Sequence, residues 1–183
     1  MLSGFLQEQR FQAVIPYLNG SILDLGCGLA NLTYYLKPGQ YYVGIERPEP
    51  FLTWLQQHRP NYRFHQRDLD QDLLALDEQF DTITMIAVIE HLKQPAFILR
   101  QIPSVMRPEA HLVITTTSPI GDWIHRFGAQ LGLFSKQAVK EHHTIFSPTS
   151  MHTALIQNGL KLVTYKRFLM GGNQLFIAKA VTR

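Results

Sequence analysis

Two glycines that follow a short apolar run and an acid form the most informative group of residues in this chain. Residues 22–25 read Ile-Leu-Asp-Leu, and Gly26 and Gly28 come directly after them. The apolar run predicts a buried strand, and the glycines let the backbone turn tightly and approach a ligand closely. Residues 31–36 then favour a helix. A strand, a glycine loop and a helix in this order predict a site for a nucleotide-type cofactor.

The acid in this group, Asp24, narrows the class of cofactor. The dinucleotide fingerprint has a third glycine at its sixth position, where this chain has Asn31. A carboxylate two residues before the first glycine would repel a pyrophosphate but would attract a positively charged cofactor. S-adenosylmethionine carries a sulfonium and an ammonium group, so the pattern favours it over NAD. A strand-to-helix connection that binds no ligand is the alternative interpretation.

A second acid follows the next expected strand, residues 41–45. Glu46 stands 46 − 24 = 22 residues after Asp24. In doubly wound folds an acid about 20 residues along the chain binds a ribose hydroxyl, and one carboxylate can accept from both hydroxyls of a ribose. We therefore predict that Glu46 binds a ribose and that Arg47 lies in the same cofactor site. A surface glutamate that caps a helix is the alternative.

A third acid, Asp68, follows the expected strand at residues 62–66. Its carboxylate could accept a hydrogen bond from an adenine amino group. Asp70 and Asp72 lie close enough along the chain to take this role instead. A local Asx turn is the alternative interpretation of Asp68.

Two polar residues, Glu90 and His91, follow an apolar run at residues 80–89 that predicts a strand buried on both faces. Ligands of open α/β sheets bind beyond the carboxyl ends of the strands, so this pair is expected near the chemistry. An imidazole is well matched to general-base work near neutral pH, which makes His91 the first candidate catalytic residue. The alternative is a histidine that bonds locally and only shapes the strand end.

These motifs together resemble the class I S-adenosylmethionine-dependent methyltransferases. The resemblance is closest to the small-molecule branch that includes the ubiquinone-biosynthesis O-methyltransferases, and it covers about residues 20–180. The matching motifs are Leu-Asp-Leu-Gly-Cys-Gly at 23–28, Gly-Ile-Glu at 44–46, Arg-Asp at 67–68, Phe-Asp at 80–81, Val-Ile-Glu-His-Leu at 88–92 and Met-Arg-Pro-Glu-Ala at 106–110.

The resemblance implies methyl transfer from S-adenosylmethionine to a small-molecule acceptor such as a hydroxyl, by in-line displacement and without a metal. A non-catalytic regulator or partner subunit that binds S-adenosylmethionine or S-adenosylhomocysteine is the alternative. The implied contacts are Asp24, Gly26 and Gly28 at the methionine end, Glu46 on the ribose, Asp68 and Leu69 at the adenine, and Ile86 as a wall beside it; Cys27 and Arg47 complete the expected cofactor site.

Two residues depart from the family pattern. Ala30 stands where the family often has a third glycine, and Ala110 replaces a turn glycine before the fifth strand. If the backbone at Ala110 needs a positive φ, the alanine costs about 1 kcal/mol. Neither change removes an expected cofactor contact.

Length and composition predict a single globular domain over residues 1–183. The chain is 45% hydrophobic and 17% charged, and its net charge of +3 is too small to indicate nucleic-acid binding. The single cysteine, Cys27, excludes an internal disulfide and a Cys-rich zinc site, and we expect it to fill space. We expect a cytoplasmic protein without a membrane span, because residues 1–10 lack an apolar signal core and no run reaches about 18 apolar residues.

Alternating helices and strands predict an α/β fold, with a doubly wound, Rossmann-like and mostly parallel sheet of seven strands. Turn residues 171–173 join the last two expected strands in a hairpin, so the last strand should run antiparallel. We expect a leading helix near 5–18 and strands near 22–25, 41–45, 62–66, 80–87, 111–117, 160–168 and 174–180.

Residues 119–150 are the expected substrate-side lid. Apolar residues at 120–134 recur at helical spacing, which also fits a helix that faces the core. The family often has a histidine just before a Phe-Ser pair, so His142 or His143 is expected in the pocket wall, and His142 is the second candidate catalytic residue. Adjacent histidines do not share a helix face, which argues against a two-histidine metal site.

Overall fold

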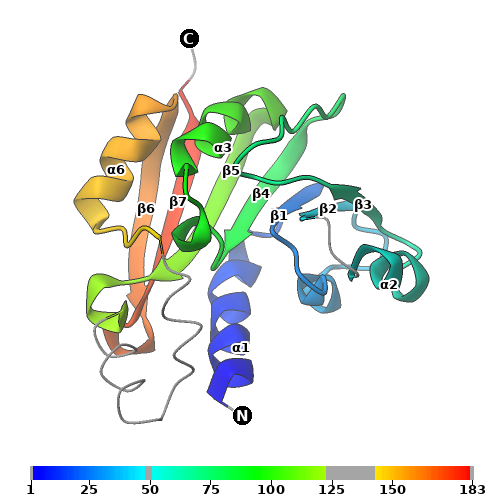
Figure 1. The fold of residues 1–183 in the computed structure, drawn as a ribbon, viewed down its shortest axis with the longest axis horizontal. Coiled ribbons are helices and arrows are strands. Elements are labelled where there is room, and N and C mark those ends of the chain that lie inside the picture. The colour runs from blue at the N-terminus through cyan, green and yellow to red at the C-terminus, as the bar shows by residue number, and fades with distance from the viewer. Residues whose placement is uncertain (1, 48–50, 123–142, 182–183) are drawn as a thin grey trace.

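A mostly parallel sheet forms the middle layer of the structure, a computed structural model that describes residues 2–47, 51–122 and 143–181 (Figure 1). Within these ranges the sheet has seven strands, in the order β3-β2-β1-β4-β5-β7-β6. β7 runs antiparallel to both of its neighbours, and the other pairs are parallel. The predicted fold class is therefore confirmed. The strands are β1 (Ile22–Leu25), β2 (Tyr42–Glu46), β3 (Arg63–Gln66), β4 (Phe80–Ile86), β5 (Met106–Thr117), β6 (Leu160–Phe168) and β7 (Asn173–Ala180).

One hydrophobic cluster joins helix α1 (Leu2–Val14) and helix α2 (Phe51–His58) to the sheet. Val14 and Leu55 are fully buried in this cluster, together with Tyr42 of β2. Of the helices in the described ranges, none is long and apolar enough to cross a membrane.

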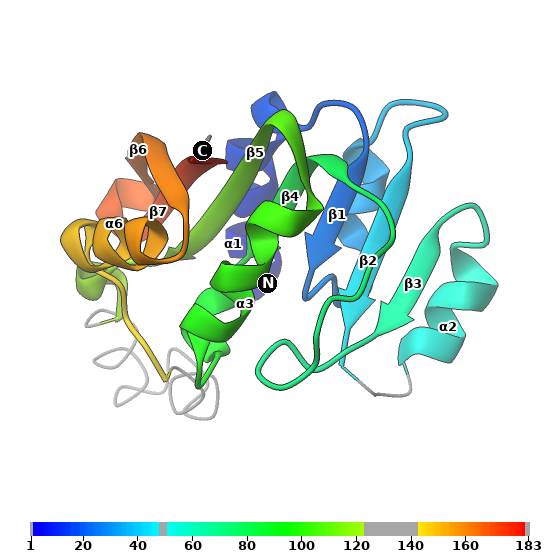
Figure 2. The same cartoon turned by 90° about the horizontal axis from the view of Figure 1, so that it is seen from above.

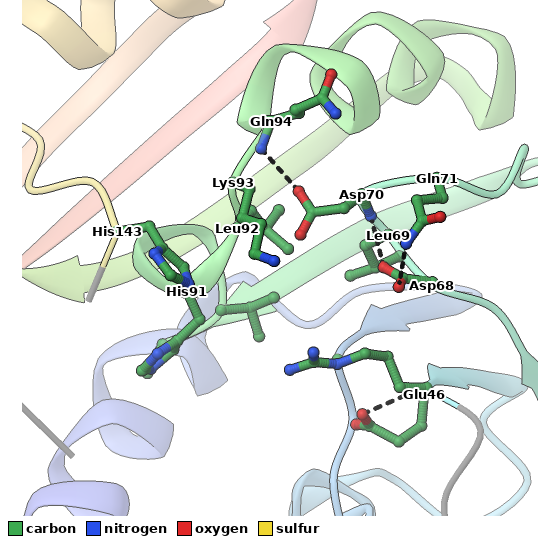
Figure 3. Close-up of a pocket in the computed structure, with 14 residues that line it drawn as sticks. Glu46, Asp68, Leu69, Asp70, Gln71, His91, Leu92, Lys93, Gln94 and His143 are labelled. Atoms are coloured by element: carbon green, nitrogen blue, oxygen red, sulfur yellow. Dashed lines mark hydrogen bonds between the residues drawn. The ribbon is translucent and has the colours of Figure 1, made fainter. Parts of the chain in front are cut away.

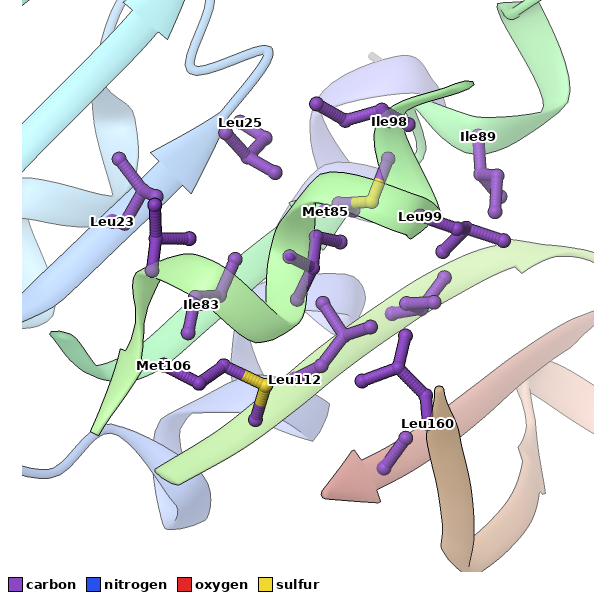
Figure 4. Packing of buried hydrophobic residues seen from close by; sticks show 14 of the residues in the cluster. Leu23, Leu25, Ile83, Met85, Ile89, Ile98, Leu99, Met106, Leu112 and Leu160 are labelled. Carbon is purple, nitrogen blue, oxygen red and sulfur yellow. The ribbon is translucent and has the colours of Figure 1, made fainter. Parts of the chain in front are cut away.

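A second, larger cluster joins helix α3 (Pro95–Gln101) and helix α6 (Pro148–Gln157) to the sheet. Leu99 is fully buried there with sheet residues such as Ile83 (Figure 4). Leu155 of α6 is fully buried in the same cluster. Figure 2 shows α3 and α1 on opposite sides of the sheet. The short 3-10 helices are η1 (Ile15–Tyr17), η2 (Asn31–Tyr35), η3 (Ile89–His91), η4 (Ile102–Val105) and η5 (Leu169–Gly171).

Side-chain alternation along β1 and β4 decides which cluster each residue joins. Leu23 and Leu25 of β1 lie in the larger cluster, with α3 and α6. Ile22 lies in the α1 cluster, so Asp24, two residues on, points to the same face as Ile22. Along β4, Ile86 likewise belongs to the α1 cluster. This alternation places Asp24 and Ile86 on one side of the sheet.

Left-handed backbone marks two places where the family pattern has glycines. Ala30 is buried with φ 53°, a conformation that costs a non-glycine residue about 1–2 kcal/mol. Before the parallel part of β5, the left-handed residue is Glu109, with φ 64°, and not Ala110. The backbone strain that was expected at Ala110 therefore lies at Glu109. Lys179 Nζ donates to Glu109 Oε2 at 2.6 Å, which ties this turn to β7.

Two element boundaries differ from the expectation. Residues 31–36 form only the 3-10 helix η2, because the left-handed Ala30 precedes it and Pro38 follows two residues after Leu36. β5 begins at Met106 rather than near 111, since Met106 already pairs with Phe80 before the register shifts between Phe80 and Thr82. Of the expected lid at 119–150, the structure describes only 119–122 and 143–150.

Candidate functional site

Two cavities lie at the carboxyl ends of the central strands. The larger, the strand-end cavity, has a volume of about 750 Å³ and is lined by residues that follow β2, β3 and β4. The smaller, the loop cavity, has a volume of about 430 Å³ and lies between α1, the glycine loop and β4. Both cavities are lined by Gly26 and Ala87, so they meet at the glycine loop.

The glycine loop is shaped by left-handed backbone at Gly26, with φ 72°, and at Gly28, with φ 52°. A Cβ on Gly26 would come within 2.6 Å of the Val88 side chain, so this glycine allows the loop to pack on the end of β4. A Cβ on Gly28 would meet no heavy atom within 4 Å. The side of Gly28 therefore faces open space, where a ligand can approach the backbone.

Asp24 is a buried carboxylate in the wall of the loop cavity. Tyr42 Oη donates to Asp24 Oδ2 at 2.8 Å, and Thr84 Oγ1 donates to Oδ1 at 2.6 Å. Burial, with a smaller contribution from the nearby Glu46 charge, raises the pKa of Asp24 to about 6, and these two hydrogen bonds oppose the change. At neutral pH the group is ionised, and it faces the cavity as a negative charge with little solvent around it.

Glu46 connects the end of β2 to the glycine loop. Its Oε2 accepts from the Gly28 backbone N–H at 2.6 Å, and its Oε1 accepts from the Arg47 N–H at 3.0 Å. Each carboxylate oxygen has a second lone pair, so Glu46 can still accept hydrogen bonds from a ligand. Glu46 lines the strand-end cavity (Figure 3), and so does Arg47.

Asp68 and Asp70 both line the strand-end cavity, whereas Asp72 is not among its lining residues. Asp68 accepts from the Asp70 N–H at 2.9 Å and from the Gln71 side chain at 3.1 Å. Asp72 Oδ2 accepts from the Asp68 N–H at 2.7 Å, so Asp72 stabilises the loop that follows β3. Asp70 Oδ1 accepts from the Gln94 N–H at 2.7 Å, so both acids are already engaged in local hydrogen bonds at the cavity wall (Figure 3). Leu69 lines the same cavity.

Ile86 does not lie beside Asp68 and Leu69. It lines the loop cavity, with Asp24 and Cys27. Ile86 points to the α1 face of β4, so its role as a wall beside the adenine stays a prediction. Cys27 is half-buried, and burial raises the pKa of its thiol well above the usual range, which disfavours a nucleophilic role.

His91 and His143 come together in the wall of the strand-end cavity, although they are 52 residues apart in the sequence (Figure 3). The His143 N–H donates to the Glu90 carbonyl at 2.8 Å, which holds its segment against η3. His142, the second candidate catalytic residue, lies outside the described residues. The signal for His143 in the sequence was the family's histidine just before a Phe-Ser pair.

Several lining residues carry no sequence motif. Arg10 and Phe11 of α1 line the loop cavity, and Lys93 and Gln94 line the strand-end cavity. α1 precedes β1 and carries no motif of its own, so only the folded structure shows that Arg10 lies at the glycine loop. Within the described ranges, no group of three or more His, Cys, Asp or Glu side chains is arranged to hold a metal ion.

A family model described as a methyltransferase domain matches residues 7–165 of the chain. The chain belongs to the class I S-adenosylmethionine-dependent methyltransferases. This confirms the resemblance inferred from the motifs. Solved structures show the same fold: the glycopeptide N-methyltransferase MtfA in complex with S-adenosylmethionine has a TM-score of 0.70 at 14% identity, covering 95% of this chain and 86% of that one.

Two other similarities bear on the kind of acceptor. A ubiquinone biosynthesis O-methyltransferase of Acinetobacter baylyi is 25% identical over 150 residues, or 77% of this chain and 63% of that protein. A tRNA U34 carboxymethyltransferase of Pseudoalteromonas atlantica is 26% identical over 124 residues, or 63% of this chain and 38% of that protein. The chain spans about two-fifths of the length of the first curated relatives that it matches.

Proposed function

We propose that this domain binds S-adenosylmethionine across the two joined cavities and methylates a small-molecule hydroxyl held beside His91. The observation that carries the proposal is the position of three acids around one glycine loop. Asp24 lies in β1, Glu46 ends β2 and Asp68 follows β3, and these three strands are parallel neighbours. The three acids therefore lie at the same end of the sheet, Asp24 in the loop cavity and Glu46 and Asp68 in the strand-end cavity, where ligands of such folds bind.

The residues present fit this cofactor. The open side of Gly28 leaves room for a ligand against the backbone, and Glu46 has lone pairs available for ribose hydroxyls. The ionised Asp24 attracts positive charge and would repel a pyrophosphate. When bound, S-adenosylmethionine supplies an electrophilic methyl group on a positively charged sulfur. Asp68 and Leu69 remain for the adenine, at the far side of the strand-end cavity.

His91 is the proposed general base. It accepts the proton of the acceptor hydroxyl as the hydroxyl oxygen attacks, and the neighbouring apolar side chains of Val88 and Leu92 help to keep water out. His143 lies beside it and is the second candidate on the same wall. The reaction needs alignment and a base, and this wall supplies both.

The strand-end cavity, of about 750 Å³, would hold part of the cofactor as well as the acceptor. A volume within the usual range of small-molecule sites, shared in this way, supports a small acceptor. A screen with labelled S-adenosylmethionine would test this, with phenols and other small hydroxyl compounds in one arm and unmodified tRNA in another. We expect label on a small hydroxyl compound. Label on tRNA alone would contradict the small-molecule acceptor. Cofactor binding without transfer to any acceptor would favour the non-catalytic binder.

Replacing Glu46 tests the ribose contact. Glu46→Ala removes two charge-assisted hydrogen bonds to the ribose, each worth about 1.5–3 kcal/mol, so affinity for S-adenosylhomocysteine should fall at least about tenfold. Glu46→Gln keeps one acceptor oxygen, so its affinity for S-adenosylhomocysteine should lie between those of the wild type and Glu46→Ala. Calorimetry measures the affinity, and Glu78→Ala is the control, because Glu78 is a surface carboxylate that accepts from the Tyr41 hydroxyl and lines neither cavity. Unchanged affinity in a folded Glu46→Ala protein would place the ribose acid elsewhere.

A further inference from the structure

Glu90 is the most deeply buried charged side chain near the two histidines. Its side chain is fully buried, with 0% exposure. Oε1 accepts from the Thr117 N–H at 3.2 Å and from Thr117 Oγ1 at 3.4 Å, at the end of β5. Oε2 has no hydrogen-bond partner among the described residues. A buried carboxylate that is only half satisfied is costly to stability, so its retention points to another role.

The backbone of the same residue holds the other histidine. The Glu90 carbonyl accepts from the N–H groups of His143, at 2.8 Å, and Thr144, at 3.2 Å. His91 is the next residue in η3, and its own N–H donates to the Val88 carbonyl at 2.9 Å. Glu90 therefore connects three segments, η3, the end of β5 and the segment that starts at 143, where both histidines face one cavity (Figure 3).

An opposite charge lies near this carboxylate. Arg10 of α1 donates from Nε to Asn173 Oδ1 at 2.9 Å, and Asn173 pairs with Thr117 across β7 and β5. Burial lowers the pKa of Arg10, and the Glu90 charge opposes that change. Hydrogen bonds and strand pairing thus connect Arg10, which lines the loop cavity, to Glu90 by way of Asn173 and Thr117.

We infer that Glu90 is a positioning residue for the transfer reaction: its carboxylate fixes η3 against β5, its carbonyl fixes the segment at 143, and the two together set the placement of His91 and His143. This inference rests on the proposed function, because it concerns the same cavity wall. It assigns Glu90 no contact with substrate or cofactor. Misplacing a catalytic group by about 1 Å can lower a rate about a hundredfold, so a modest shift is sufficient for a large effect.

A double-mutant cycle tests whether Glu90 acts through His91. Glu90→Gln should lower kcat about tenfold to a hundredfold, while the affinity for S-adenosylhomocysteine changes less than about twofold. In a His91→Ala background the same change should cost less than about twofold, because the group that it positions is already absent. Full additivity of the two losses would contradict the inference. If Glu90→Gln does not fold, Thr117→Val removes one of the same hydrogen bonds with a smaller perturbation.

A measurement without turnover separates this inference from the proposed function. NMR spectra of the histidine rings should show that Glu90→Gln moves the signals of His91 and His143 together and leaves the signal of His58 in place. Asp81→Asn is the matched control, since Asp81 is a carboxylate that ties Ser21 to Arg107, bonding partners that line neither cavity. Unmoved His91 and His143 signals in Glu90→Gln would overturn the inference, even if methyl transfer is demonstrated. Moved signals would support it, even if no acceptor is found.

Discussion

Replacing His91 with alanine is expected to lower the rate of methyl transfer by about 10²–10⁴-fold, the usual contribution of a general base. The affinity for the cofactor should change little, because the imidazole would contact the acceptor and not the adenosine. The loss should shrink as the pH rises, since a hydroxyl that ionises unaided no longer needs a base. Rates measured over a pH series with saturating cofactor would show both effects.

Two companion variants make this result specific. His58→Ala is the control, because His58 lies on α2 and stacks on Trp54 with ring centroids 4.3 Å apart, and it lines neither cavity. His143→Ala reports on the second histidine of the wall. Wild-type turnover in a folded His91→Ala protein would remove His91 from the catalytic role and leave His143 and His142 as the candidates.

Replacing Asp24 with asparagine is expected to stabilise the fold at neutral pH. Burial raises the pKa of Asp24 from its ordinary value of 3.8 to about 6. A folded-state pKa above the unfolded value means that stability falls as the pH rises from about 4 to about 6, and stays lower above that window. A difference of about 2 units between the folded and unfolded pKa values lowers the free energy of unfolding by about 3 kcal/mol at pH 7. Urea unfolding should show that Asp24→Asn raises the free energy of unfolding by up to about this amount at pH 7 and by little at pH 4.

The same variant should bind S-adenosylmethionine at least about tenfold more weakly, because a negative charge facing the loop cavity is lost. Affinity for S-adenosylhomocysteine, which lacks the sulfonium charge, should fall less. Asp81→Asn is a control in which the free energy of unfolding should change in the opposite direction. Burial alone would raise the pKa of Asp81, but bonds from Ser21 and the Arg107 cation lower it overall, so its replacement should destabilise the fold. An Asp24→Asn protein less stable than wild type at pH 7 would contradict this account.

Strand periodicity and turn residues were sufficient to predict the sheet and its antiparallel last strand. β1, β2, β4 and β5 carry buried apolar runs, whereas the edge strand β3 is only half-buried. The hairpin around Gly172 has its own turn signal. The acids Asp24, Glu46 and Asp68 could be placed because strand ends of a parallel sheet meet at one edge. Their positions at the cavities follow directly from topology.

Other features depend on tertiary structure, and the sequence does not encode them locally. The family resemblance that predicted the role of Ile86 carries no information on the face of β4 to which its side chain points. Side-chain alternation turns Ile86 to the α1 face. The left-handed residue of β5 is Glu109, in the stretch between Met106 and His111 where the register against β4 shifts. Arg10 reaches the loop cavity only through the packing of α1. The partnership of His91 with His143 depends on the hydrogen bonds of Glu90.

The most direct test of the account is calorimetry of the domain with three ligands: S-adenosylmethionine, S-adenosylhomocysteine and NAD. The acids around the glycine loop predict binding of the first two in the micromolar range and no binding of NAD. Binding of NAD without binding of S-adenosylmethionine would contradict the assignment of Asp24, Glu46 and Asp68, and with it the proposed function.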